Sequence, residues 1–211
     1  EHILVQNEDA LFLANMPPIQ GILRSQNKAN YDQQDKSTYQ QWVKRQESIF
    51  VSMLRNKSEY LKIRFIDKHG QEKIVVGREG EKIISLSAEE LQNKSHRTYF
   101  IETLKLPKGS VYLSEINLNR EHGKVSYPHN EVLRSSAPFF DEVSGEVAGL
   151  ILITAKISHE LRAIQDSVKA IGWGYMSGNT VYLTKNAIAS TDGWTTSGLK
   201  RVYGTFWVRT T

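Results

Sequence analysis

The sequence predicts an α+β protein in which a helical N-terminal segment precedes a central antiparallel sheet. Extended runs with alternating side chains follow one another through the middle of the chain, at residues 60–67, 72–78, 110–118, 132–140 and 147–154. Short polar stretches rich in turn residues separate them, such as Lys68-His-Gly-Gln71 and Asp141 to Gly145. Consecutive runs joined by short turns pair as antiparallel neighbours, which gives the predicted sheet.

The N-terminal segment is predicted to be helical. Apolar residues between Ile3 and Met16 lie close to one helical face, and Pro17-Pro18 interrupts the pattern before it resumes at Ile19. After a polar gap, a second helix is predicted over residues 38–54. Its buried side is expected to comprise Trp42, Ile49, Phe50 and Met53. We expect these apolar stripes to pack on the core, with the first helix also available for a dimer contact.

A further helix is predicted between the second and third extended runs. Ser87-Ala-Glu-Glu90 fits a capping box, in which the serine hydroxyl accepts from one free backbone amide and the glutamate reaches back to another. The helix is therefore predicted to begin near Ala88 and to end with Arg97-Thr-Tyr-Phe100.

The C-terminal part predicts a smaller second α/β module. Residues 158–171 have helical spacing, and extended runs follow at 180–184, 187–189 and 201–209. About 40 residues are few for an independent core, so this module is either abbreviated and supported by the first or incomplete. We predict three parts: an N-terminal helical segment at 1–56, the sheet module at 57–157, and a linker helix with the reduced module at 158–211.

Composition restricts the possible function classes. The 211 residues include no cysteine, which excludes disulfides and thiolate chemistry, and the 24% of charged residues is typical of a folded globular protein. No apolar run reaches the roughly 20 residues needed to cross a bilayer. The net charge of +4 is consistent with an anionic ligand or an anionic membrane surface, and also with ordinary solvated lysines.

Catalytic signatures are missing or lack their context. Ser158-His-Glu-Leu-Arg162 is similar to the phosphoacceptor box of sensor histidine kinases, but no glycine-rich phosphate loop accompanies it and the proline that usually follows is replaced by Ala163-Ile-Gln165. The six histidines have no metal-ligand spacing, and no Gly-x-Ser-x-Gly motif occurs. We therefore expect no enzymatic activity, no cofactor and no metal site. The scattered basic residues do not predict nucleic-acid binding.

Four segments taken together carry a family resemblance. They are YLKIRFIDKHGQE from Tyr60, ELQNKSHRTYF from Glu90, GSVYLSEINLN from Gly109 and VLRSSAPFFDEVSGEVAGLILI from Val132. In this order they resemble the extracytoplasmic Cache domains, also called PDC or PAS-like sensor domains, of bacterial transmembrane receptors. The resemblance implies a PAS-like module with flanking membrane helices, in the periplasmic portion of an inner-membrane histidine kinase or diguanylate cyclase. A chain that begins at Glu1 without a methionine is expected to be a fragment of such a receptor.

The resemblance also implies a ligand pocket between the sheet and the helix and loop that cover it. The candidate lining residues are Arg97, Tyr99, Phe100, Tyr112, Ser114, His129 and Arg134. The two arginines could each hold a carboxylate or phosphate in a bidentate fork, and the aromatic residues would form apolar walls. Two alternatives stay open: Arg134 pairs with Asp141 or Glu131 across a turn, and Phe100 belongs to the core.

The pattern departs from the amino-acid-binding Cache domains, which use an arginine, a tryptophan-tyrosine pair and a later aspartate. The segment SHRTYFIETLKL has the arginine and the aromatic pair Tyr99-Phe100, but no tryptophan. We therefore expect a small organic anion, such as a carboxylate, rather than an α-amino acid. An empty pocket in a domain that works through protein contacts is the other reading.

The predicted function is ligand sensing without chemistry. A small anionic molecule would favour one arrangement of the loops over the sheet, and helices joined to the membrane would transmit the difference, with the N-terminal helix as the lever in a possible homodimer. The alternative is a periplasmic interaction module that recognises a partner protein without a small ligand. Exposed Trp173, Trp194 or Trp207 would favour that alternative, because aromatic anchors are enriched at binding hot spots.

Overall fold

The computed structural model describes residues 2–26, 28–121, 124–125, 130–158, 173–177, 180–183, 199–202 and 205–208. The chain divides into two units, and each is described by itself. Residues 1–114 and 134–155 form the first unit, and residues 115–133 and 156–211 form the second. The three parts predicted from the sequence have other boundaries and stay predictions.

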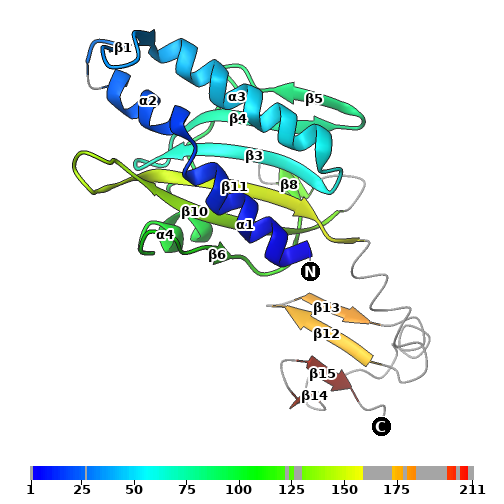
Figure 1. Ribbon diagram of the computed structural model, residues 1–211. Coiled ribbons are helices and arrows are strands. Elements are labelled where there is room, and N and C mark those ends of the chain that lie inside the picture. The colour runs from blue at the N-terminus through cyan, green and yellow to red at the C-terminus, as the bar shows by residue number, and fades with distance from the viewer. Residues whose placement is uncertain are drawn as a thin grey trace. The chain divides into compact units, whose positions relative to one another are not determined.

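A single antiparallel sheet organises the first unit (Figure 1). Its strand order is β5 (Lys82–Ser85), β4 (Glu72–Glu79), β3 (Tyr60–Asp67), β11 (Val147–Lys156), β10 (Glu131–Phe140) and β6 (Tyr112–Leu113). Central strand β3 pairs antiparallel on both sides, with Ile63 opposite Ile153 on β11 and opposite Val76 on β4. The predicted hairpin at 60–78 and the predicted strands at 132–140 and 147–154 are therefore confirmed. The run predicted at 110–118 is instead two short strands, β6 and β7 (Asn117–Leu118).

Three helices cover one face of this sheet: α1 (His2–Ala14), α2 (Pro17–Gln26) and α3 (Tyr39–Asn56) (Figure 1). Pro17 begins α2, where the missing N–H of a proline costs no helical hydrogen bond, so the predicted break falls between two helices. Thr38 caps α3: the Gln41 N–H donates to Thr38 Oγ1 at 3.2 Å, and the Thr38 N–H donates to Gln41 Oε1 at 2.8 Å. A short hairpin of β1 (Tyr31–Asp32) and β2 (Ser37–Thr38) joins α2 to α3.

The main core lies between these helices and the sheet. Trp42 and Phe50 of α3 are buried as predicted, whereas Ile49 and Met53 are only partly buried and pack at the margin of the same core. The strands contribute the residues that point to this face, among them Ile63, Phe65, Val76, Ala137, Phe139, Ile151 and Ile153. The rings of Phe65 and Phe139 lie with centroids 4.6 Å apart. This arrangement is the expected α+β class with helices on one face of an antiparallel sheet.

The opposite face of the sheet is covered by residues 86–97 and by α4 (Thr98–Thr103). The helix predicted to begin near Ala88 is wrong. The N–H and the hydroxyl of Ser87 both donate to Glu90 Oε2 at 2.8 Å, but the Glu90 N–H donates to the Ser87 carbonyl at 3.0 Å and not to the hydroxyl, so these residues close a turn. Backbone hydrogen bonds then hold the chain extended beside the start of β4, from the Glu72 N–H to the Gln92 carbonyl at 3.1 Å and from the Lys94 N–H to the Gly70 carbonyl at 2.6 Å. Because these bonds fix an extended backbone, the helix begins only after Arg97.

In the second unit, the C-terminal strands are β12 (Trp173–Ser177), β13 (Thr180–Leu183), β14 (Leu199–Val202) and β15 (Thr205–Val208). They pair antiparallel in the order β13-β12-β15-β14. The strand predicted at 180–184 corresponds to β13, and the run predicted at 201–209 is a hairpin of β14 and β15 rather than one strand. The same unit contains the short hairpin of β8 (Arg120–Glu121) and β9 (Lys124–Val125). The predicted segment 187–189 and all but the first residue of the predicted helix 158–171 lie outside the described residues.

Gln46 is a polar residue buried in the core of the first unit. It is fully buried on α3, and neither polar atom of its side chain has a hydrogen-bond partner among the described residues. A buried polar group without a partner costs about 1–3 kcal/mol. Gln46→Leu, which nearly conserves volume, is therefore expected to raise the free energy of unfolding by about 1 kcal/mol.

Urea denaturation of the wild-type chain and of Gln46→Leu measures this difference in the free energy of unfolding. The control is Gln40→Leu, a substitution of an exposed residue on the same helix. Equal or lower stability for Gln46→Leu than for the control would show that the amide is hydrogen-bonded in solution.

Candidate functional site

A buried ion pair lies on the sheet face that α4 covers. Arg64 comes from the middle of β3, and its Nε donates to Glu72 Oε1 of β4 at 3.1 Å. Arg64 Nη1 donates to Thr154 Oγ1 of β11 at 3.1 Å, so three adjacent strands meet at this guanidinium. The Arg64 side chain is 12% exposed and that of Glu72 is 3% exposed. The second carboxylate oxygen of Glu72 accepts from the Gln92 N–H at 2.9 Å, which ties the pair to the segment before α4.

Tyr99 of α4 lies partly buried next to this pair. Burial raises the pKa of its hydroxyl, and the charge of Glu72 acts in the same direction, whereas the charges of Arg64, Arg134 and Arg97 oppose the shift. The hydroxyl is therefore neutral at physiological pH and able to donate a hydrogen bond. The charges of three arginines and one glutamate thus act on this hydroxyl.

Arg97 and Arg134 approach Tyr99 from different elements. Arg97 precedes the first residue of α4, and its guanidinium has no hydrogen-bond or ion-pair partner in the described part of the chain. Arg134 lies on β10, where its N–H donates to Ser114 Oγ at 3.0 Å and its carbonyl accepts from the Ser114 N–H at 2.9 Å. Ser114 thus holds the backbone that carries Arg134. The charges of both predicted arginines therefore act on Tyr99.

The remaining predicted residues have other environments. Phe100 is buried and packs with Ile66, Leu150 and Leu152, so the core alternative describes it correctly. Tyr112 of β6 lies opposite Ser136 and is partly buried. The Ser136 hydroxyl lies 2.5 Å from Thr103 Oγ1, a contact that joins β10 to α4. His129 lies outside the described residues.

Sequence reasoning missed Arg64 and Glu72. Arg64 alternates with Ile63 and Phe65, and such a charged residue normally marks the solvent face of a strand. The sequence of β11 could have indicated this burial. Leu150 and Leu152 alternate with Ile151 and Ile153, so both faces of the strand are apolar. Strand β11 must therefore be covered on both sides, and Arg64 lies beside it on the second covered face.

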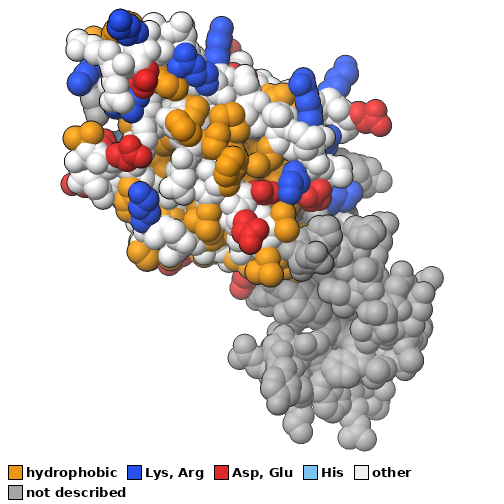
Figure 2. All heavy atoms as spheres, in the orientation of Figure 1, with side chains coloured by type: hydrophobic (Ala, Val, Ile, Leu, Met, Phe, Trp, Pro, Cys, Tyr) orange, Lys and Arg blue, Asp and Glu red, His pale blue; other side chains and the backbone are white. Residues whose placement is uncertain are grey.

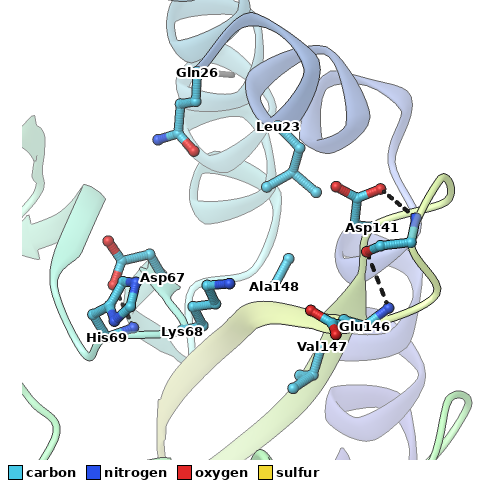
Figure 3. A pocket seen from close by; sticks show the side chains of 10 residues that line it. Leu23, Gln26, Asp67, Lys68, His69, Asp141, Glu146, Val147 and Ala148 are labelled. Atoms are coloured by element: carbon cyan, nitrogen blue, oxygen red, sulfur yellow. Dashed lines mark hydrogen bonds between the residues drawn. The ribbon is translucent and has the colours of Figure 1, made fainter.

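A cavity of about 230 Å³ lies elsewhere in the first unit, between α2 and two turns of the sheet (Figure 3). Its lining consists of Leu23, Gln26, Asp67, Lys68, His69, Asp141, Ser144, Glu146, Val147 and Ala148. Lys68 extends into the space from the β3–β4 turn, and Leu23 and Gln26 approach it from α2 (Figure 3). Asp141 braces the other turn by accepting from the Ser144 N–H at 3.1 Å. None of the predicted pocket residues that the structure describes lines this cavity.

Two further properties concern the part of the chain that the structure describes. No group of three or more His, Asp or Glu side chains is arranged to hold a metal ion there. No helix in that part is both long enough and apolar enough to span a membrane.

A family profile described as the sensor domain of bacterial histidine kinases matches residues 19–170. Comparison with curated proteins gave no significant match. The matched range contains the sheet and α4, and therefore every residue of the site described above.

Solved structures show the same architecture. A domain of a sensory box/GGDEF family protein from Vibrio parahaemolyticus has 23% identity and a TM-score of 0.58, and the match covers 74% of this chain and 53% of that one. The sensor domain of the V. cholerae histidine kinase DctB has 13% identity and a TM-score of 0.50, with 82% and 55% coverage. The ligand-binding domain of the Campylobacter jejuni chemoreceptor Tlp3, solved with 4-methylisoleucine, has 10% identity and a TM-score of 0.51, with 89% and 73% coverage. At these identities the likeness shows a common fold, and the chain spans about half the length of the first structure.

Proposed function

Because this chain belongs to the family of bacterial histidine kinase sensor domains, we propose that it senses a small anionic molecule for a membrane receptor. The resemblance to Cache-type sensors is confirmed by that match and by the common fold, and the matched family is a sensory domain rather than an enzyme. The observation that carries the proposal is that three arginines, Arg64, Arg97 and Arg134, act on Tyr99, and that Arg97 has no ion-pair partner among the described residues. Carboxylates and phosphates are the groups that arginine binds in a bidentate manner.

The solved relatives support a small ligand. The Campylobacter chemoreceptor domain was solved with 4-methylisoleucine, a molecule that carries a carboxylate. In our proposal Arg97, Arg134 and the Tyr99 hydroxyl contact the anion, while Ser114 supports the strand of Arg134. Tyr112 and His129 remain proposed lining residues, and Phe100 supports α4 from the core.

Hydrogen bonds link the site to α1 through the sheet. On the opposite face of β11 and β10, Gln6 Nε2 donates to the Ile153 carbonyl at 3.3 Å and Ser135 Oγ donates to Asn7 Oδ1 at 2.7 Å. Ile153 precedes Thr154, which accepts from Arg64, and Ser135 follows Arg134. A shift of these strands on ligand binding would therefore reach α1 directly. We propose α1 as the element that passes the change towards the membrane.

Membrane anchoring and dimerisation belong to the same proposal. We place the chain in the periplasm, as part of a histidine kinase or diguanylate cyclase whose membrane helices flank it, with residues 158–211 as the reduced membrane-proximal module. Hydrophobic side chains gather over the helices on the face shown in Figure 2. On α1, Leu4 is 66% exposed and Phe12 is 57% exposed, and burial of such residues against a second copy would favour a homodimer.

A thermal-shift screen tests the proposed function. The chain is heated with carboxylates, phosphates, amino acids and polyamines in large excess. A ligand present at ~100 times its dissociation constant stabilises the fold by roughly 2.7 kcal/mol, so a bound anion should raise the melting temperature by several degrees. Arg97→Ala is expected to weaken this binding at least ~10-fold while the fold is kept, because the Arg97 side chain has no hydrogen-bond or ion-pair partner among the described residues.

Arg55→Ala is the matched control, since Arg55 is exposed in the last turn of α3 on the other face of the sheet. Binding that both variants weaken equally would point to general charge attraction. A flat screen from well-folded protein would contradict the proposal and favour recognition of a partner protein. The three tryptophans that this alternative invoked lie where the structure describes no side chains.

A further inference from the structure

The Arg64 guanidinium is fixed by two hydrogen bonds, and these use only part of its donor capacity. Its Nε donates to Glu72 and its Nη1 donates to Thr154, both at 3.1 Å, whereas Nη2 has no partner among the described residues. Thr154 is 2% exposed and Glu72 is 3% exposed, so both partners are fixed by packing. Three of its five N–H groups thus have no acceptor among the described residues, and Nη2 is not fully buried, so water or a ligand can accept from it.

The groups around Arg64 determine what that acceptor can be. The Tyr99 hydroxyl is a neighbouring neutral donor on which the charges of Arg97 and Arg134 act, and the Arg97 guanidinium is unpaired among the described residues. Glu72 already accepts from both Arg64 and the Gln92 N–H, so its two oxygens are engaged. Since the available groups are donors and cations, an oxyanion complements them and an amine does not.

We propose that Arg64 binds the carboxylate of the ligand directly and that Glu72 is a positioning residue that orients Arg64 and limits anion affinity. This inference rests on the proposed function and adds to it a ligand contact in the floor of the site. Glu72 acts through two effects of opposite sign. Its hydrogen bonds fix the guanidinium, whereas its negative charge repels an incoming anion.

A purely structural ion pair would behave differently on mutation. Glu72→Gln keeps the shape of the side chain and an acceptor for Arg64 Nε but removes the negative charge. Our proposal predicts tighter anion binding for this variant, by about 10-fold, because the like charge next to the ligand is gone. A pair that serves only folding predicts lower stability with unchanged affinity.

The test is calorimetric titration of acetate, succinate and inorganic phosphate into the wild-type chain and its variants. Glu79→Gln is the control for charge, because Glu79 is exposed on the same strand β4. Removing Arg64 alone would leave Glu72 buried without its counter-ion, so the pair is replaced together as Arg64→Met/Glu72→Met, which removes both charges and keeps volume. We expect this double variant to fold and to lose at least ~10-fold in affinity for the carboxylates.

The outcomes separate the two proposals. Tighter binding by Glu72→Gln but not by Glu79→Gln, with loss of binding in the folded double variant, supports the role of Arg64. Carboxylate binding that is unchanged in the double variant overturns that role and leaves the proposed function standing. Stronger binding of phosphate than of either carboxylate overturns the assignment of a carboxylate ligand. If the wild-type chain binds none of these anions, both the role of Arg64 and the proposed function are overturned.

Discussion

Gly149→Ala should lower the free energy of unfolding by about 3 kcal/mol or more, because β11 passes too close to β3 for a side chain. Gly149 lies opposite Asp67 in the sheet. A Cβ atom at this position would lie 2.2 Å from the Ile66 carbonyl oxygen and 2.5 Å from Cζ of Phe139. Neither neighbour can retreat cheaply, since the first belongs to a central strand and the second is a buried ring stacked on Phe65.

Gly145→Ala is the matched control for this prediction. Gly145 lies in the adjacent turn with φ of 72°, and a Cβ there would meet no atom within 4 Å. Its substitution is therefore expected to cost only the backbone strain of a left-handed residue, roughly 1 kcal/mol. Urea denaturation measures both proteins, and the melting temperature of Gly149→Ala should fall by about 6–12 °C. Equal losses in the two variants would show that the approach of β11 to β3 is looser than the structure indicates.

Asp32→Asn should destabilise the chain by about 2 kcal/mol at neutral pH, because Asp32 joins α2, α3 and the hairpin between them. This carboxylate is 2% exposed. It accepts from Arg24 Nη2 at 2.7 Å, from Trp42 Nε1 at 3.2 Å and from the Gln34 N–H at 3.1 Å. An asparagine side chain keeps one oxygen for these donors and turns an amide towards the rest, and of the two carboxylates paired with Arg24 the more exposed Asp35 alone stays charged.

The same residue predicts a pH dependence. The hydrogen bond from Arg24 is the largest of the effects that hold the pKa of Asp32 below its usual value of 3.8. A lowered pKa contributes stability that is complete above the unfolded value and is lost as the pH falls through the folded value. The stability difference between wild type and Asp32→Asn should therefore stay constant from pH 7 to about 5 and shrink below pH 4. A difference that persists undiminished at pH 2 would exclude the ionised carboxylate as its source.

Alternation and turn chemistry were sufficient to predict most of the sheet and the N-terminal helices. Residues 60–67 and 72–78 are extended runs on either side of a turn, and they form the predicted strands β3 and β4. Phe50 and Trp42 recur at the spacing of one helical face and are both buried on α3. The segment around Ser87 behaved differently. Ser87 and Glu90 contact each other in a turn, and extended pairing of Gln92 and Lys94 with the start of β4 outweighs helix propensity.

The candidate site could be predicted only in part from the sequence. Arg97, Tyr99 and Arg134 followed from the family resemblance, and in the structure the charges of both arginines act on Tyr99. Arg64 and Glu72 were missed because a charged residue in an alternating strand is typical of a solvent-exposed face. Arg64 is buried because α4 and the segment before it fold back over the sheet. This packing depends on residues distant in the sequence, so the residues of β3 alone do not predict it.

The most direct test of the account is to record amide NMR spectra of the chain during titration with the anion that gives the largest thermal shift. We predict saturable changes for the amides of Arg64, Gln92 and Tyr99, with the amides of Lys68 and Ser144 at the other cavity unaffected. Changes confined to Lys68, Ser144 and their neighbours, with Tyr99 unmoved, would contradict the account and place the anion site between α2 and the turns of the sheet.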